Sequence, residues 1–294
     1  MADSVPWKHH SALIITSILY GFIGIFIKYI GTAIPLMTIT FLRFFFALLL
    51  LVLVVPLIDR NTFHLAARDF WHYAFMGFLV AAAISTYNAA LFYSTVSAVT
   101  LIWSVYVFFT AVLAYFVLNE HLTLRCFIAI LIGIAGLVLI NPLTGGGNLL
   151  GNVIALISAG FYATYLVFIR RDERSHTLGM VFWIILFATL YLLPFPFIFG
   201  LGQLSGAPLL WMLLLGFGCT GIAYLLLNVG LARVEADSAS VLILVVSTIA
   251  SLFLAWLLLD EHIGTRMLIG GAMMIIAGVI MELKYPRIRH AHHR

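Results

Sequence analysis

Two stretches of the chain match each other without a gap, and they decide the fold. Residues 97–125 read SAVTLIWSVYVFFTAVLAYFVLNEHLTLR, and residues 238–266 read SASVLILVVSTIASLFLAWLLLDEHIGTR. At an offset of 141 positions, 11 of the 29 residues are identical, and both stretches end in Glu-His-x-x-x-Arg after an apolar run of helical length. Similarity at a fixed offset indicates an internal repeat. The sequence therefore predicts two halves of related structure.

The composition places both halves in a membrane. Of the 294 residues, 64% are hydrophobic and 9% are charged, whereas soluble proteins have about 25% charged residues. Two cysteines allow one bridge at most, which excludes a disulfide-stapled secreted domain. The first apolar run lacks a small-x-small cleavage site and is expected to stay as a span. Runs that can cross a bilayer core of about 30 Å cover ten ranges: 12–30, 35–58, 72–93, 96–118, 124–141, 150–169, 178–199, 209–230, 237–259 and 264–283.

Each half holds five of these spans, with the boundary between residues 146 and 147. Because five is an odd number, the halves must insert in opposite orientations. Inverted repeats are typical of secondary transporters, whose halves exchange inward-open and outward-open shapes; the alternative is a duplication that only supplies a stable bundle. We predict an all-α membrane protein of ten transmembrane helices, arranged as two inverted five-helix repeats (1–146 and 147–294) around a central cavity.

Lysine and arginine are distributed unequally between the two ends of the predicted spans. With ten spans both termini lie on one side, and twelve of the fifteen basic residues fall there, whereas Lys28 and Arg266 fall on the other side and Arg43 within a span. Cytoplasmic loops are enriched in these residues. We therefore expect a multi-pass protein of the plasma (inner) membrane with both termini cytoplasmic. The net charge of +4 is then a consequence of topology, and no nucleic-acid partner is expected.

Several motifs resemble those of a known family. They are Leu42-Arg43-Phe44-Phe45-Phe46-Ala47 in the second span, Gly221-Ile222-Ala223-Tyr224 with Asn228 in the eighth, Ala255-Trp256-Leu257-Leu258-Leu259-Asp260-Glu261 at the end of the ninth, and Gly270 to Gly278-Val279 in the tenth. Over nearly its whole length the chain resembles ten-helix, EamA-type members of the drug/metabolite transporter superfamily. This resemblance implies two inverted repeats around a central cavity and, usually, export of small metabolites. The family often has proline in the fourth and ninth spans, but this chain has Val107 and Thr248 there, so kinks at those places are not expected.

Polar side chains within the spans are candidates for lining the cavity, because a polar group that faces lipid is costly. In span four, Trp103, Tyr106 and Thr110 recur at spacings of three and four, which places them on one face of a helix. Their counterparts in span nine are Leu244, Ser247 and Ser251. Matching faces are what a cavity between two repeats requires. The alternative for the hydroxyl groups is hydrogen bonding between packed helices.

Three further spans contain polar and aromatic candidates. They are Tyr87 and Asn88 in span three, Ser158, Tyr162 and Tyr165 in span six, and Thr220, Tyr224 and Asn228 in span eight. The residues of span eight lie four apart, again on one face. In the alternative interpretation, a tyrosine near a span end belongs to the interfacial belt; Tyr162, close to the middle of its span, is less open to that objection.

Arg43 is the one strongly charged residue well inside a predicted span. A charge at that depth costs at least about 2.5 kcal/mol on insertion scales, so it needs a partner or water. Two roles are open. The guanidinium binds a substrate carboxylate, or it donates to backbone carbonyl groups where helices cross.

The acidic residues all lie at span ends or in loops. Proton antiport through a buried glutamate is therefore disfavoured, and so is strong cation selectivity, although aromatic faces could hold a cation. Glu120 and Glu261 are expected to bind at helix ends, with His121, Arg125 and their counterparts as further partners. An uncharged or zwitterionic, partly apolar solute fits this pattern best.

Other functional classes find less support. A membrane-embedded enzyme would need His-Glu-x-x-His, paired aspartates within a span, or a serine with a nearby histidine, and a channel would need a filter loop; neither pattern is present. We predict a secondary transporter that exports small metabolites such as amino acids by alternating access, through facilitated diffusion or exchange. The alternative is a multidrug transporter or an antiporter of nucleotide sugars or other metabolites. No cofactor or metal is expected; the partners are a small-molecule substrate and the lipid bilayer, for a monomer or weak homodimer.

Overall fold

A computed structural model describes residues 7–58, 65, 69–119, 123–140, 149–171, 178–234 and 236–282. Within these ranges every regular element is a helix. In chain order the helices are α1 (Trp7–Ile30), α2 (Leu36–Ile58), α3 (Phe70–Tyr93), α4 (Val96–Trp103), α5 (Tyr106–Val117), α6 (Leu124–Ile140), α7 (Leu149–Arg171), α8 (Leu178–Leu192), α9 (Pro194–Phe199), α10 (Gly206–Leu213), the π-helical η2 (Leu214–Ile222), α11 (Ala223–Leu231), α12 (Ala236–Leu259) and α13 (Thr265–Glu282).

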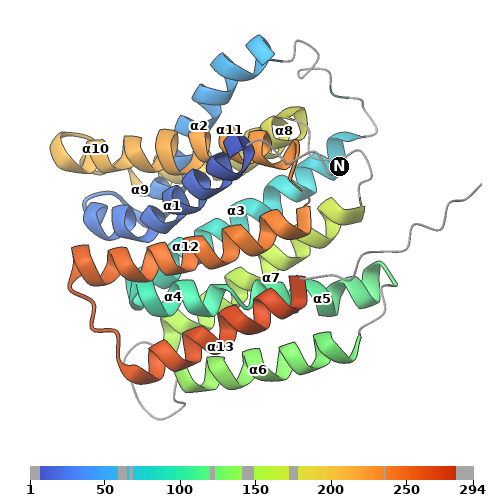
Figure 1. The fold of residues 1–294 in the computed structure, drawn as a ribbon. Helices are drawn as coiled ribbons and strands as arrows, with labels where there is room; N and C mark the ends of the chain where they lie inside the picture. The colour runs from blue at the N-terminus through green and yellow to red at the C-terminus, as the bar shows by residue number, and fades with distance from the viewer. Residues whose placement is uncertain are drawn as a thin grey trace, which may run out of the picture.

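The ten-span organisation is confirmed in the described part of the chain. Eight segments are long and apolar enough to cross a membrane, and α6 and α13 are shorter apolar helices. Successive segments run in alternate directions through one bundle (Figure 1). We call the end of the bundle where α1 begins and α13 ends the terminal face. The opposite end, where α1 ends and α13 begins, is the far face.

Helices of the two halves pack against each other in symmetric pairs. The last helix of the first half, α6, packs on α13, the last of the second, and α2 packs on α8. Likewise α3 packs on α7, and the equivalent pair from the other half is α11 on α1. Each of these helices thus packs on a helix of the other half, and equivalent helices make equivalent pairs, as expected for an inverted repeat. The predicted boundary at 146/147 lies outside the described residues and stays a prediction.

Two glycines bring α6 and α13 into close contact at the edge of the bundle (Figure 1). A Cβ atom on Gly136 would lie 2.7 Å from the carbonyl oxygen of Gly270, and one on Gly270 would lie 2.6 Å from the carbonyl oxygen of Gly136. Small residues let helix backbones approach in a membrane, where packing drives association. This pair therefore depends on glycine at both positions.

The fourth span is interrupted by a turn at Ser104 and Val105, between α4 and α5. Their amide nitrogens donate to carbonyl oxygens three residues back, at 3.2 and 3.1 Å, which tightens the helix locally. The Ser104 hydroxyl also donates to the carbonyl oxygen of Thr100, at 3.0 Å, a bond that often bends helices. The expectation of an unkinked helix is confirmed for α12, which is continuous through Thr248. In the fourth span the helix is interrupted at Ser104 and Val105, just before Val107 and without a proline.

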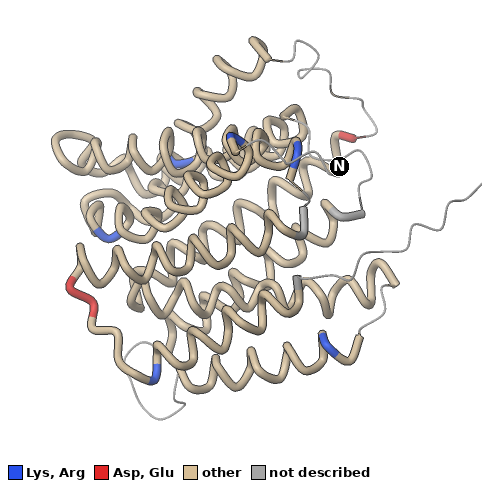
Figure 2. Tube along the Cα trace, in the orientation of Figure 1, with Lys and Arg blue, Asp and Glu red and all other residues tan. Residues whose placement is uncertain are grey.

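Charged residues of the described chain gather at the two ends of the helices (Figure 2). Arg43 differs from them, because it lies within α2 and is 4% exposed. The sides of the bundle instead expose large apolar side chains such as Leu53, Phe116 and Leu257. An apolar belt between two charged ends matches the polarity profile of a bilayer.

Candidate substrate cavity

Two adjoining cavities lie between the two repeats. The inner cavity, of about 100 Å³, is lined by α1 to α5 of the first half and by α7, α11 and α12 of the second. The outer cavity, of about 230 Å³, extends toward the terminal face. Its lining residues Ile169, Leu231 and Ala239 lie within three residues of helix ends on that face. The pair of cavities thus forms a path from the terminal face to the middle of the bundle.

Four tyrosines line both cavities and mark the boundary between them. Tyr20 and Tyr106 come from α1 and α5 of the first repeat, and Tyr162 and Tyr224 come from α7 and α11 of the second. Each repeat therefore contributes two hydroxyl-bearing rings to this boundary. A solute that passes from the outer to the inner cavity would meet the rings of both halves.

An aromatic cluster fills one side of the inner cavity. The ring centroids of Trp103 and Tyr106 are 4.8 Å apart, those of Trp103 and Tyr162 are also 4.8 Å apart, and those of Tyr106 and Tyr162 are 5.0 Å apart. Tyr87 and Tyr165 extend the cluster at 5.6 and 5.7 Å. The turn after Trp103 begins α5 at Tyr106, so both rings can reach Tyr162 of α7. Such a cluster offers ring faces and edges to a partly apolar solute.

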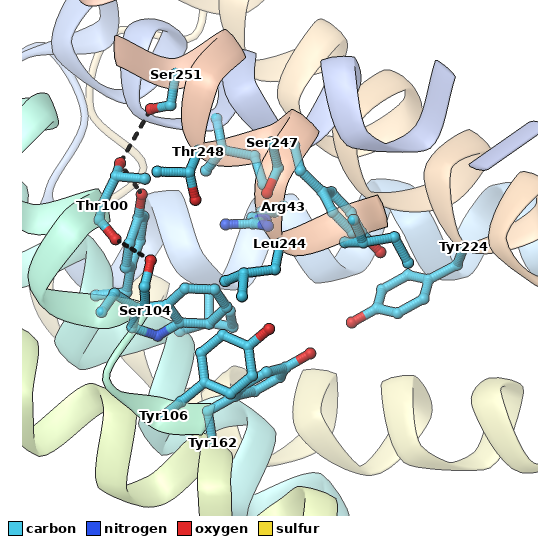
Figure 3. A pocket seen from close by; sticks show the side chains of 16 residues that line it. Arg43, Thr100, Ser104, Tyr106, Tyr162, Tyr224, Leu244, Ser247, Thr248 and Ser251 are labelled. Atoms are coloured by element: carbon cyan, nitrogen blue, oxygen red, sulfur yellow. Dashed lines mark hydrogen bonds between the residues drawn. The ribbon is translucent and has the colours of Figure 1, made fainter. Parts of the chain in front are cut away.

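Hydroxyl groups link the two repeats on the side of the inner cavity nearer the far face. The Thr100 hydroxyl of α4 hydrogen-bonds with that of Ser251 on α12, at 3.0 Å (Figure 3). It also lies 3.4 Å from the hydroxyl of Tyr87. Because these groups satisfy one another, they join α4 to α12 rather than standing ready for a solute.

Further contacts close the bundle between these hydroxyl groups and the far face. Glu261 binds at the start of α4, accepting hydrogen bonds from the backbone nitrogens of Val96 and Ser97, which confirms that it binds at a helix end. Lys28, at the end of α1, donates to the carbonyl oxygen of Ser94 at 2.9 Å. Glu120 and His121, the equivalents of Glu261 and His262, lie outside the described residues. The inner cavity is therefore reached from the terminal face.

Arg43 reaches into the inner cavity from α2 (Figure 3). Its Nε donates to the hydroxyl oxygen of Thr220 at 2.9 Å. The Thr220 hydroxyl in turn donates to the carbonyl oxygen of Leu215, five residues earlier, within the π-helical turn η2. The wider π turn thus presents the threonine that holds one edge of the guanidinium. A close approach of α2 to η2 makes this possible, since a Cβ on Gly216 would lie 2.6 Å from that of Phe46.

The structure brings nine of the ten sequence-predicted residues to the two cavities. Seven line the inner cavity: Arg43, Tyr87, Trp103, Tyr106, Tyr162, Tyr224 and Ser247. Tyr165 and Asn228 line the outer cavity, which three of the tyrosines share. Whether these residues bind a solute stays a prediction.

Asn88 is the predicted residue that lines neither cavity. It is fully buried, and its Nδ2 donates to the hydroxyl of Thr40 on α2 at 2.9 Å. Two further candidates bond to backbone groups: the Ser158 hydroxyl donates to the carbonyl oxygen of Ala83 on α3, and the Thr110 hydroxyl donates within α5 to that of Tyr106. For Asn88 and Ser158 the structure supports the alternative role of hydrogen bonding between packed helices.

Sequence reasoning missed four polar residues of the inner cavity. They are Tyr20, Thr100, Ser104 and Thr248. Thr100 lies three residues before Trp103 and four before Ser104, spacings that place Thr100 beside each of them on a helix face, so the helical period could have found both hydroxyl residues. The predicted polar face instead followed the helical period through the turn at 104–105 to Thr110. Tyr20 was detectable as a tyrosine in the middle of an apolar span.

The model of the EamA-like transporter family matches twice, over residues 7–141 and 149–283. The chain belongs to the EamA-like transporter family. As an EamA-like protein it is a multi-pass membrane transporter, and the two matches correspond to its two repeats.

Relatives of this EamA-like chain are also named as transporters. It is 27% identical over 276 residues to an uncharacterized transporter of Archaeoglobus fulgidus, covering 92% of this chain and 94% of that protein. It is 26% identical over 233 residues to an S-adenosylmethionine uptake transporter of Rickettsia prowazekii, covering 77% of each. A solved crystal structure shares the fold, with a TM-score of 0.68 at 20% identity over 92% of this chain and 96% of that one.

Proposed function

We propose that the protein exports small metabolites such as amino acids across the plasma membrane by alternating access. The observation that carries this proposal is the position of the inner cavity between two inverted repeats, both of which line it. Two similar halves around one site can exchange which face of the membrane the site opens to. The contacts of Glu261 and Lys28 on the far face, with an open outer cavity on the terminal face, correspond to one of these two states.

The distribution of basic residues supports an orientation for the proposed transporter, whereas the net direction of facilitated diffusion follows the gradient of the solute. Of the described basic residues, Lys8, Arg125 and Arg233 lie at the terminal face, and Lys28 and Arg266 lie at the far face, which favours the cytoplasm for the terminal face. With that orientation, the outer cavity opens inward. An inward-open state is the one in which an exporter loads its solute.

The lining favours a small solute with an apolar or aromatic part. The rings of Trp103, Tyr106 and Tyr162 supply the apolar surface, and Ser247 and Tyr224 add hydroxyl groups. The residues that line the two cavities include no aspartate or glutamate. This favours facilitated diffusion or exchange over coupling to a proton through a carboxylate in the cavity.

Counterflow into proteoliposomes tests this proposal. Purified protein would be reconstituted with an unlabelled amino acid inside, and uptake of the labelled compound followed for a panel of aromatic, aliphatic and charged amino acids. We expect saturable uptake of at least one neutral amino acid, strongly reduced by Trp103→Ala. The matched control is Trp256→Ala on α12, whose side chain is 55% exposed on the side of the bundle. If no amino acid crosses, the amino-acid part of the proposal is wrong.

S-adenosylmethionine is a second candidate substrate and belongs in the same panel. It is favoured by the name of the relative from Rickettsia prowazekii. The aromatic cluster could face its sulfonium cation, but Arg43 in the same cavity repels a cation. Uptake of this compound, without uptake of neutral amino acids, would favour the second candidate.

A further inference from the structure

The inner cavity contains one buried positive charge and no opposite charge. The Arg43 guanidinium is 4% exposed, and the sixteen residues that line this cavity include no carboxylate. Arginine stays protonated in proteins, so its charge cannot be removed by loss of a proton. A buried charge is stable only when it is paired or hydrogen-bonded. The cavity is therefore electrostatically suited to an anionic group of a ligand.

Two hydrogen-bond donors on residues that line this cavity have no partner among the described residues. They are Nη1 of Arg43 and Nε1 of Trp103, and both atoms are buried. Buried polar groups in proteins are nearly always hydrogen-bonded. Both atoms can only donate, so the missing partner has to be an acceptor. A carboxylate supplies two acceptor oxygens together with the negative charge.

The Arg43 side chain is held in an orientation that suits this role. Its Nε is occupied by Thr220, which is itself anchored to the carbonyl oxygen of Leu215. The rest of the guanidinium extends into the cavity. Thr248 and Leu244 of α12 lie on one side of it, and the hydroxyl groups of α4 lie on the other (Figure 3). A preoriented guanidinium loses little freedom when it binds a carboxylate.

We propose that Arg43 and Trp103 together bind a carboxylate group of the solute, so that the substrates are small carboxylates with an apolar or aromatic body. The statement that such carboxylates are transported rests on the proposed function. The binding site itself is inferred from the two unpaired donors. The body of the solute lies against the ring cluster formed by Trp103, Tyr106 and Tyr162. An amino group is not required, because the carboxylate provides the charge that the cavity lacks.

Three probes that share a phenyl ring test the proposal on the purified wild-type protein. They are 3-phenylpropionate, with a carboxylate only, phenethylamine, with an ammonium only, and L-phenylalanine, with both. Binding would be measured by thermal shift and by titration calorimetry. We expect 3-phenylpropionate and L-phenylalanine to bind at least about tenfold more tightly than phenethylamine, since charge-assisted hydrogen bonds are the strong ones. Equal or tighter binding of phenethylamine would overturn the proposal without any variant.

Variants then assign the carboxylate to its two donors. We expect Arg43→Gln to weaken binding of 3-phenylpropionate at least about tenfold, and Trp103→Phe, which keeps a ring but removes Nε1, to weaken it several-fold. Arg266→Gln is the control, because it removes an exposed positive charge at the start of α13. Unchanged affinity in folded Arg43→Gln protein would refute the subsite.

Transport assays separate this inference from the proposed function. If 3-phenylpropionate binds through Arg43 but no carboxylate crosses proteoliposome membranes, the carboxylate site is supported and the proposed transport of such solutes is refuted. If amino acids cross at rates that do not depend on Arg43, transport stands and the carboxylate site is wrong.

Discussion

Glu261 and Ser97 connect the two repeats on the far face. The Glu261 carboxylate, in the turn after α12, accepts hydrogen bonds from the backbone nitrogen and the hydroxyl of Ser97, at 2.9 and 2.7 Å, and from the backbone nitrogen of Val96 at 2.7 Å. A carboxylate is favourable at a helix N-terminus because of the unpaired N–H groups and the helix dipole. One acidic side chain thus caps a helix that lies 164 residues away in the sequence.

Replacing Glu261 by glutamine should weaken the closure of the far face. The neutral amide loses a charge-assisted interaction worth roughly 1 kcal/mol. The reporter is a cysteine introduced in the inner cavity by Ser247→Cys. We expect it to react several-fold faster in Glu261→Gln than with Glu261 intact, when an impermeant thiol reagent is added on the far-face side. The native cysteines would first be removed as Cys126→Ser and Cys219→Ser.

The neighbouring acid gives a matched control for this experiment. Asp260 lies in the same turn at φ 51°, a conformation that asparagine tolerates. Asp260→Asn should leave the labelling rate unchanged. The idea fails if the reagent labels the Ser247→Cys protein no faster with Glu261→Gln than with Glu261 intact.

Tyr224→Ala should raise the solute concentration for half-maximal counterflow by several-fold. Tyr224 lines both cavities from α11, so its loss removes contact area and a hydroxyl at their boundary. Tyr115→Ala on α5 is the control, because that ring is 44% exposed outside the two cavities. Equal effects of the two substitutions would argue against a binding role for Tyr224.

Gly270→Ala should lower the thermal stability of the protein in detergent. The added methyl group would meet the carbonyl oxygen of Gly136 at 2.6 Å, and overpacking of this kind costs roughly 1–3 kcal/mol. Gly160→Ala makes the same change within α7 where no atom lies within 4 Å, and it should be neutral or stabilising. A melting temperature for Gly270→Ala at or above that of Gly160→Ala would contradict the close packing of α6 and α13.

Collapse of the pH gradient by an ionophore should change counterflow less than about twofold. Within the described chain, acidic residues lie at helix ends and in turns, and none lines the two cavities. Flux measured with equal and unequal pH across proteoliposomes checks this expectation. Abolished flux without a gradient would reveal a coupling group elsewhere in the protein.

Most of the fold could be predicted from the sequence, because apolar length and an odd number of spans per repeat leave few arrangements. The turn at Ser104 and Val105 could not. The Ser104 hydroxyl bonds to the carbonyl oxygen of Thr100, but Thr16 and Thr189 make the same kind of bond within the continuous helices α1 and α8, so this bond does not identify a turn. Helical spacing therefore grouped Thr110 with Trp103, although Thr110 lies beyond the turn and lines neither cavity.

The candidate site was harder to predict, because helical spacing identifies a polar face without saying what that face meets. Tyr87 and Asn88 show the difficulty. As neighbours on α3 they point about 100° apart, and the structure separates them: Tyr87 lines the inner cavity, and Asn88 packs against Thr40 of α2. Only the placement of α2 decides between these two polar side chains.

The described length of α6 has a consequence for the surrounding lipid. Its 17 described residues extend about 25 Å at 1.5 Å per residue, whereas the hydrocarbon core of an average bilayer is about 30 Å thick. Together with α13, its packing partner, it forms one edge of the bundle. A span of this described length is accommodated along that edge when the bilayer thins or the helices lie more upright than their neighbours, at fractions of a kcal/mol per ångström of mismatch. The acyl chain length of the surrounding lipids should therefore affect how favourably this protein inserts in a bilayer.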